Sequence, residues 1–196
     1  MTYDLLLALA AFALVSSLTP GPNNLMLMAS GANFGFLRTV PHMLGVALGF
    51  MVMVILVGLG LEQIFDRFPI TRIGLQMACI GYLLWLAWKI AHAAAPGEAA
   101  ATARPMTFWQ AAAFQWVNPK AWAMALTALG AYAPSQEFWA VVLVAVIFGA
   151  INLPSVSTWV VLGQQVRRWL SDPVWLRRFN WTMAALLILS VLPLLR

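Results

Sequence analysis

The sequence predicts an all-α integral membrane protein with six transmembrane helices, arranged as two inverted three-helix repeats with broken first and fourth helices. Three observations support this prediction. Of the 196 residues, 63% are hydrophobic and only 9% are charged, whereas about 25% of the residues of ordinary soluble domains are charged. Apolar windows long enough to cross a bilayer follow one another along the chain. The first and the fourth of these windows each contain a polar helix breaker near the centre.

The first window, from about residue 4 to residue 31, is predicted to be a helix that breaks in its middle. The breaker is TPGPNN at residues 19–24, whose prolines lack the backbone N–H, whose glycine relaxes the backbone and whose asparagines offer side-chain donors and acceptors. In lipid, an interrupted helix is tolerated only where the freed backbone groups face protein, water or a ligand. We interpret the break as a binding site at the middle of the membrane; the alternative is a proline kink packed by neighbouring helices. The candidate site residues here are Pro20, Gly21, Pro22, Asn23 and Asn24.

Five further windows follow at about residues 41–61, 70–89, 107–131, 138–162 and 178–195. Between the third and the fourth window lies a polar connector, residues 91–106, which is the longest predicted loop. The connector divides a single transmembrane domain, residues 1–196, into halves of about residues 1–90 and 107–196.

The fourth window contains the second breaker, NPKA at residues 118–121, with the only charge of that window, Lys120. A lysine at this depth is costly unless it faces water or a partner. Pro119 follows Pro20 by 99 residues, and the same shift places the second window on the fifth and the third roughly on the sixth. Because each half has an odd number of spans, the second half enters from the opposite face, which is the inverted-repeat plan of secondary transporters. Asn118, Pro119 and Lys120 are therefore candidate site residues.

The distribution of basic residues predicts the orientation. Basic residues favour cytoplasmic loops, and seven lie in the predicted loops after odd-numbered spans, against three on the other side. The connector is therefore predicted to be cytoplasmic and both termini periplasmic. The net charge of +5 follows from these loops, so nucleic-acid binding is not inferred. The seven basic residues are Arg38, Lys89, Arg104, Arg167, Arg168, Arg177 and Arg178.

Four motifs together resemble the lysine-exporter (LysE) superfamily. They are TPGPNN at residues 19–24, PHMLG at residues 41–45, LAWKI at residues 86–90 and NPKA at residues 118–121. The chain most resembles the branch that exports homoserine, threonine, cysteine, O-acetylserine and related neutral amino acids. This resemblance implies a multi-pass exporter of the bacterial inner membrane that exchanges its substrate for protons. It also assigns substrate binding to the two breakers.

Two further polar positions lie inside predicted spans. His42 is the only histidine within a span, and histidine titrates near neutral pH; it either carries protons or is an interfacial residue held by hydrogen bonds. Asn152, with Pro154, forms a polar and helix-weakening position that can line the same cavity as the breakers. Gln115 can do the same, or can make one hydrogen bond between helices. Gly45 and Gly49 are predicted to serve close helix packing.

Functions of other classes remain as alternatives. A membrane enzyme would need a nucleophile with a base, or a metal cluster, and none is apparent, so no catalytic residue, cofactor or metal is expected. A passive small-solute channel also fits broken helices, and a structural membrane protein is a third alternative. Because no Asp or Glu lies inside a span, the expected substrates are small amino acids with neutral side chains. The other expected partners are the lipid bilayer and a second copy of the chain in a homodimer. The choice between cysteine or O-acetylserine and homoserine or threonine is open.

Overall fold

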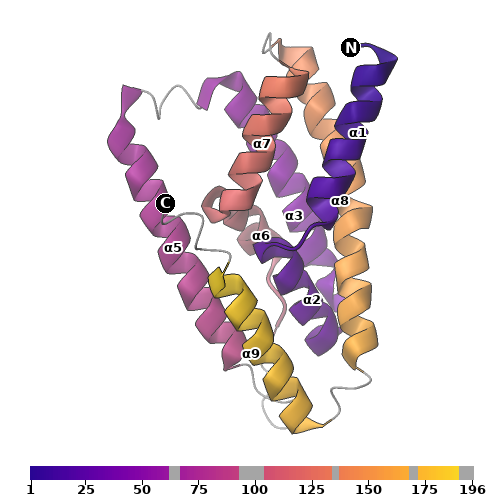
Figure 1. The fold of residues 1–196 in the computed structure, drawn as a ribbon, viewed down its shortest axis with the longest axis vertical. Helices are drawn as coiled ribbons and strands as arrows, with labels where there is room; N and C mark the ends of the chain where they lie inside the picture. Colours follow the sequence, from indigo (N-terminus) through magenta and orange to yellow (C-terminus); the bar gives the residue numbers. More distant parts are fainter. Residues whose placement is uncertain (62–66, 93–103, 134–136, 168–171, 190–196) are drawn as a thin grey trace.

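The computed structural model describes residues 1–61, 67–92, 104–133, 137–167 and 172–189. Within these ranges every regular element is helical, as predicted, and the helices run along the long axis of the molecule (Figure 1). Three of the described helices are long and apolar enough to cross a membrane, or four if the bent pair at the N-terminus is one span. The predicted number of six spans exceeds this count and stays a prediction.

The first predicted break is confirmed between α1 (Tyr3–Leu18) and α2 (Pro22–Phe34), whose axes differ by 56°. Thr19 and Gly21 both have extended backbones, with ψ angles of 144° and 175°. Each of them precedes a proline, and the proline ring disfavours the helical conformation for the residue before it. Pro22 then occupies the first turn of α2, where a missing N–H costs nothing.

The second span begins earlier than predicted. Gly35 has a φ of 81°, which glycine tolerates best, and it reverses the chain within one residue. The helix α3 (Phe36–Leu56) therefore starts five residues before the predicted Pro41, and a π-helical segment, η1 (Val57–Leu61), continues it to the predicted end. The prediction was based on a charge-free window, which marks only the part of a helix that is suited to lipid. The helix itself can begin before that window.

The helices α5 (Pro69–Ala91) and α9 (Pro173–Leu189) pack against each other at one side of the molecule (Figure 1). The third predicted window agrees with α5 to within two residues. The sixth window was expected at residues 178–195, but α9 begins five residues earlier, with a proline in its first turn, and residues 190–196 lie outside the described residues. Most of the connector, residues 93–103, also lies outside them.

The second predicted break is confirmed at Asn118. The segment consists of α6 (Phe108–Phe114), a 3₁₀ turn η2 (Gln115–Val117) and α7 (Pro119–Tyr132). Asn118 precedes a proline and has an extended backbone. Figure 1 shows both breaks near the middle of the long axis. By its place at the start of a half-helix, Pro119 corresponds to Pro22, whereas the predicted 99-residue shift places it on Pro20.

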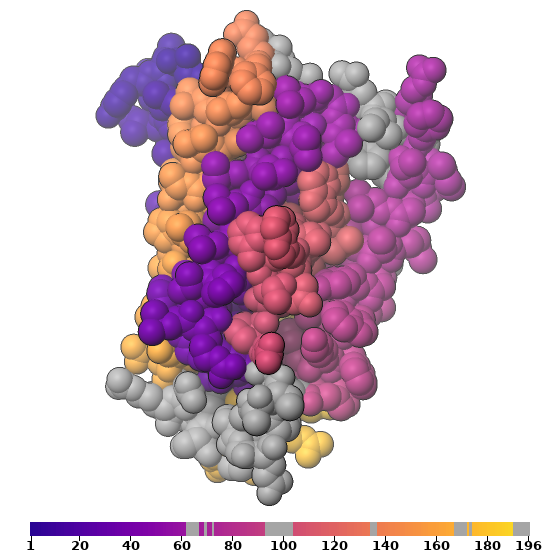
Figure 2. Space-filling model, turned by 180° about the vertical axis from the view of Figure 1, so that it is seen from behind, coloured from indigo at the N-terminus to yellow at the C-terminus, as the bar shows by residue number. Residues whose placement is uncertain are grey.

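The longest helix, α8 (Phe138–Arg167), packs along α1, α2 and α3. Its contact with α2 is close, because a Cβ atom on Gly31 would collide with the backbone of Val160, and one on Gly163 with the backbone of Met28. Gly45 and Gly49 likewise lie against the backbone of α6, so their predicted packing role is confirmed. In Figure 2, α6 lies between α3 and α5 on the back of the molecule.

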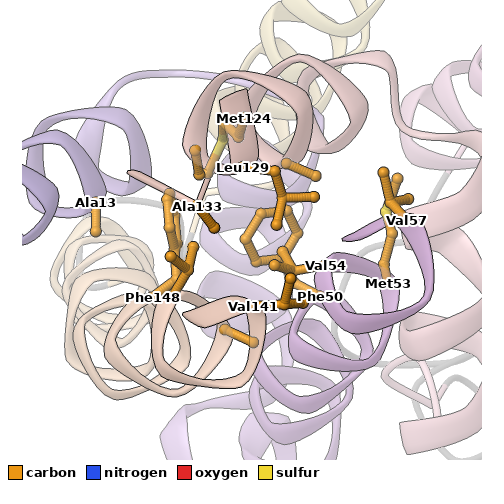
Figure 3. Packing of buried hydrophobic residues seen from close by; sticks show 14 of the residues in the cluster. Ala13, Phe50, Met53, Val54, Val57, Met124, Leu129, Ala133, Val141 and Phe148 are labelled. Carbon is orange, nitrogen blue, oxygen red and sulfur yellow. The ribbon is translucent and has the colours of Figure 1, made fainter. Parts of the chain in front are cut away.

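The largest apolar core lies where α1, α3, α7 and α8 meet (Figure 3). Phe148 is at its centre, with ring centroids 5.0 Å from Phe50 and 5.9 Å from Phe12. Met124, Leu129 and other residues of α7 complete this core. It therefore fixes α7, and with it the second break, against the helices that carry the first.

The basic residues that predict the orientation lie mostly in helices rather than in loops, which corrects their predicted placement. Three of them lie over aromatic rings of their own or the preceding helix: Arg38 over Phe34, Lys89 over Trp85 and Arg178 over Trp175, at 5.1 to 5.5 Å. These pairs belong to helix ends at the lower end of Figure 1. Arg167 and Arg177 are also helical, Arg104 precedes α6, and Arg168 lies outside the described residues.

Candidate functional site between the two helix breaks

Asn24 closes the end of α1. Its side-chain amide donates to the carbonyl oxygens of Ser17 at 2.7 Å and Thr19 at 2.8 Å. The last carbonyl groups of a helix have no partner within the helix, and in an apolar surrounding they need one. Asn24 supplies it, and its side chain is buried.

At the second break, Asn118 caps the start of the following helix instead. Its side-chain oxygen accepts a hydrogen bond from the backbone N–H of Lys120 at 3.1 Å, which caps the start of α7. Asparagine is among the preferred residues at this helix position. The chain after each break therefore restarts as a helix whose first N–H groups lie at the junction.

The ammonium group of Lys120 connects the two breaks. It donates to the carbonyl oxygen of Thr19 at 2.6 Å, to the hydroxyl of Thr19 at 2.8 Å and to the carbonyl oxygen of Pro20 at 3.4 Å. The stem of Lys120 passes Gly21 so closely that a Cβ atom there would lie 2.6 Å from its Cδ. The lysine thus has the partners that its depth requires, and glycine is the residue that leaves room for it.

A pair of amide side chains makes the second connection. Asn23 donates to Gln115 at 2.8 Å, and Gln115 donates back to Asn23 at 3.3 Å and to the carbonyl oxygen of Ala111 at 2.9 Å. Gln115 is fully buried. The interhelical hydrogen bond that the sequence left as one alternative for Gln115 is present, and it joins the first break to the helix before the second.

A small cavity lies between the breaks. The centre of a water molecule can occupy about 20 Å³ of it, and one water needs roughly 10–15 Å³ by this measure, so the cavity has room for about one water. Of the predicted site residues, six line it, and the three prolines and His42 do not. The six are Gly21, Asn23, Asn24, Asn118, Lys120 and Asn152.

Two serines of α1 also line the cavity and were not predicted. Ser16 donates to the carbonyl oxygen of Phe12 at 2.6 Å, whereas the hydroxyl of Ser17 accepts from the side-chain amide of Asn152 at 3.0 Å. Only Leu18 separates them from the TPGPNN breaker, and two adjacent hydroxyl residues in an apolar window were the only signal for them. Asn152 thereby attaches α8 to the end of α1, while its side-chain oxygen is buried without a hydrogen-bond partner among the described residues.

The cavity combines one cation, several amides and an apolar wall. Of the described residues that line it, Lys120 is the only charged one, and Phe50 and Met124 belong to the wall. A site of this composition attracts an anionic group and offers no carboxylate to a cationic side chain. Among the described residues, no group of His, Cys, Asp and Glu is placed to hold a metal ion.

The LysE family model, described as LysE type translocator, matches residues 14–196. The chain belongs to the LysE family. This LysE-family chain is 29% identical over 196 residues to a cysteine/O-acetylserine efflux protein of Klebsiella pneumoniae, covering 96% of this chain and 95% of the relative. It is 32% identical over 192 residues to the protein of that name from Escherichia coli O139:H28, covering 96% of each chain. No solved structure matches it.

Membership in the LysE family decides between the broad classes of function. A translocator moves a solute rather than transforming it, so this LysE-family protein is not an enzyme. Its apolar helices make it a multi-pass membrane protein. The predicted family is confirmed over nearly the whole chain.

His42, in the LysE-family chain, lies in α3 and does not line the cavity. It is 1% exposed, and neither ring nitrogen has a hydrogen-bond partner among the described residues. This corrects the alternative of an interfacial histidine held by hydrogen bonds. Its role in proton movement stays a prediction.

Proposed function

We propose that this LysE-family protein is a secondary transporter that exports small neutral amino acids or their derivatives across the bacterial inner membrane. The observation that supports this most directly is the cavity between two broken helices, lined by amides and one lysine. The names of the relatives favour substrates of the cysteine and O-acetylserine type; homoserine and threonine are the second choice, on the resemblance to their exporters.

The proposed architecture has six spans in two inverted halves, about residues 1–90 and 107–196. The connector of residues 91–106 is cytoplasmic in this proposal, and both termini are periplasmic. Two restarts of a helix after a proline, one in each half, support the repeat. The gathering of basic residues at one end of the helices supports the orientation.

In the proposed site, the α-carboxylate of the substrate binds Lys120 and the first N–H groups of α2, which has no side-chain cap. A helix N-terminus favours an anion through its free N–H groups and its dipole. Lys120 donates to Thr19 and Pro20, so a carboxylate replaces carbonyl oxygens that already face the ammonium group. Asn23, Asn118 and Asn152 line the remaining space. Because the cavity now has room for about one water, the site widens before it accepts an amino acid.

Exchange with protons completes the proposed cycle, and it rests on the family resemblance. His42 is the proposed proton-linked residue, because it is a buried titratable group without a hydrogen-bond partner among the described residues. Its place outside the cavity means that it would act through the movement of α3 rather than by touching the substrate.

The proposed assembly is a homodimer in the bilayer. The helix α5 exposes Ile70, Ile73, Met77 and Trp85, and either lipid or a second copy can cover such a face. Cross-linking of a Met77→Cys variant in native membranes distinguishes the two, because only a dimer through α5 gives a rapid intermolecular disulfide.

Liposomes that contain the purified protein test the proposal. They are preloaded with labelled cysteine, O-acetylserine, homoserine or threonine, and efflux is followed with and without a pH gradient. We expect saturable efflux that is faster when the outside is acidic and when unlabelled substrate is added there. A passive channel gives no acceleration by substrate on the far side, and protein without any substrate-dependent flux would contradict both functions.

The side-chain charge of the substrate gives a further prediction. No carboxylate of the described residues lines the cavity, so the second cation of lysine or arginine would enter a poorly solvated site without a partner, at a cost of several kcal/mol. We expect both to be transported more slowly than cysteine and homoserine in the same liposomes. Faster transport of lysine or arginine would contradict the proposed site.

A further inference from the structure

We propose that the side-chain oxygen of Asn152 receives the α-ammonium group of the substrate and so determines the requirement for a free amino group. This inference rests on the proposed function and assigns one end of the substrate to one residue. Asn152 is in α8, which belongs to neither broken helix. The site would therefore be completed by a third element.

The first observation is an unsatisfied acceptor. Asn152 is 5% exposed, and its side-chain nitrogen is held by the hydroxyl of Ser17 at 3.0 Å. Its side-chain oxygen is buried and has no hydrogen-bond partner within the part of the chain that the structure describes. Buried polar atoms nearly always have a partner, and an exception that borders a cavity points to a donor that enters the cavity.

The second observation is that each of the other amides at the cavity makes a hydrogen bond within the protein, and Asn24 does so by donating to the carbonyl oxygens of Ser17 and Thr19. Asn23 and Gln115 bind each other in both directions, and Asn118 caps α7 through its oxygen. Among the described residues, Asn152 is thus the amide at the cavity whose side-chain oxygen is buried without a hydrogen-bond partner. Such an oxygen suits the three N–H donors of an ammonium group, which carries no acceptor.

The third observation is the placement of charge. Lys120 and the two helix N-termini supply positive charge at the breaks, so the carboxylate belongs there and the ammonium group belongs away from them. Asn152 lies on α8, where it is hydrogen-bonded to Ser17 of α1. A zwitterion in the cavity then has its negative end at the breaks and its positive end at α8. The hydrogen bond from Asn152 to Ser17 holds the amide in the orientation that this requires.

The test compares each amino acid with its analogue that lacks the amino group. The pairs are cysteine with 3-mercaptopropionate and homoserine with 4-hydroxybutyrate, in which the analogue is smaller and cannot be excluded by size. The measurement is competition with labelled substrate in liposomes, supported by thermal stabilisation in detergent. In the parent protein we expect the amino acid to bind about 10- to 100-fold better than its analogue, as for other charge-assisted hydrogen bonds.

Two substitutions at Asn152 separate binding from folding. In Asn152→Leu the affinity for the amino acid should fall to that of its analogue, which should itself change little. In Asn152→Asp, which keeps the shape and an oxygen acceptor, the preference should be at least that of the parent. The control is Asn33→Leu, because Asn33 donates to the carbonyl oxygen of Ala29 in α2 and does not line the cavity.

The outcomes separate this inference from the proposed function. If Asn152→Leu weakens the binding of the amino acid and of its analogue equally, or changes the binding of neither, Asn152 does not bind the ammonium group. A loss of the preference for the amino acid in Asn152→Asp would have the same meaning. If Asn152→Leu does not fold, the result with Asn152→Asp decides. If the parent protein neither transports nor is stabilised by any of these amino acids, the proposed function itself has failed.

Discussion

The ammonium group of Lys120 already donates the N–H groups that would bind the carboxylate of the substrate. It donates to Thr19 and Pro20, which is the structural role that a lysine in an apolar span can have. Binding of a carboxylate would use the same three N–H groups. The two roles therefore compete, and they predict different results for the same substitution.

If Lys120 binds the carboxylate, Lys120→Met lowers the apparent affinity for cysteine by at least about tenfold, because a charge-assisted hydrogen bond is lost. Lys120→Arg retains part of the transport, since arginine binds carboxylates with a different geometry. Concentration dependence of efflux from liposomes measures both. The control is Lys89→Met, whose lysine lies over Trp85 at the far end of α5.

Substrates with an amidated carboxylate sharpen this prediction. They should be poor for the parent protein and lose little more in Lys120→Met. Unchanged affinity for free amino acids in a well-folded Lys120→Met protein would make Lys120 a purely structural residue.

We predict that rapid transport needs glycine at position 21, because the stem of Lys120 passes close to Gly21. In Gly21→Ala the new methyl group would meet the lysine stem at 2.6 Å, so the ammonium group has to leave its present partners. We expect slower transport with little loss of folding, because the stem can bend away. Gly130→Ala is the control, since a Cβ atom at Gly130 in α7 meets nothing within 4 Å. Equal transport rates in the two variants would show that the position of the lysine stem does not matter.

Between elements, the contact of α2 with α8 should dominate stability. The collisions expected there involve backbone atoms, which cannot rotate away as a side chain can. For Gly163→Ala we expect a loss of about 1–3 kcal/mol, as for other overpacked positions. Thermal unfolding in detergent measures it, and Gly81→Ala on the open face of α5 is the control. A stability equal to that of the control would mean that α2 and α8 can separate easily.

The elements also show what the sequence can predict. The breaks were predictable because proline and glycine act on the residues beside them. Helix ends were less predictable, since Arg38 and Arg177 lie inside helices although each was placed in a loop. The pairing of Asn23 with Gln115 depends on how helices from the two halves pack, and nothing local in either segment determines that. The same holds for the contact of Ser17 with Asn152.

At the scale of the whole molecule, the orientation can be tested by labelling. In a Cys79→Ala background, a cysteine at Ala99 in the connector should be shielded from an impermeant thiol reagent in intact cells, whereas one at Gln136 should react. Both positions lie outside the described residues, and the reason is the unequal distribution of basic residues. After permeabilisation both should react, which is the control. Strong labelling at residue 99 in intact cells would mean that the topology is inverted.

The hydrogen bonds that connect the two breaks also affect how readily the transporter opens when no substrate is bound. Lys120 with Thr19 and Asn23 with Gln115 join segments about a hundred residues apart. Without cargo, opening would break these bonds with nothing to replace them, and in a poorly hydrated interior each lost bond is costly. A bound zwitterion would supply replacements as it enters. The empty protein should therefore reorient slowly and leak few ions, whereas the loaded protein should turn over quickly.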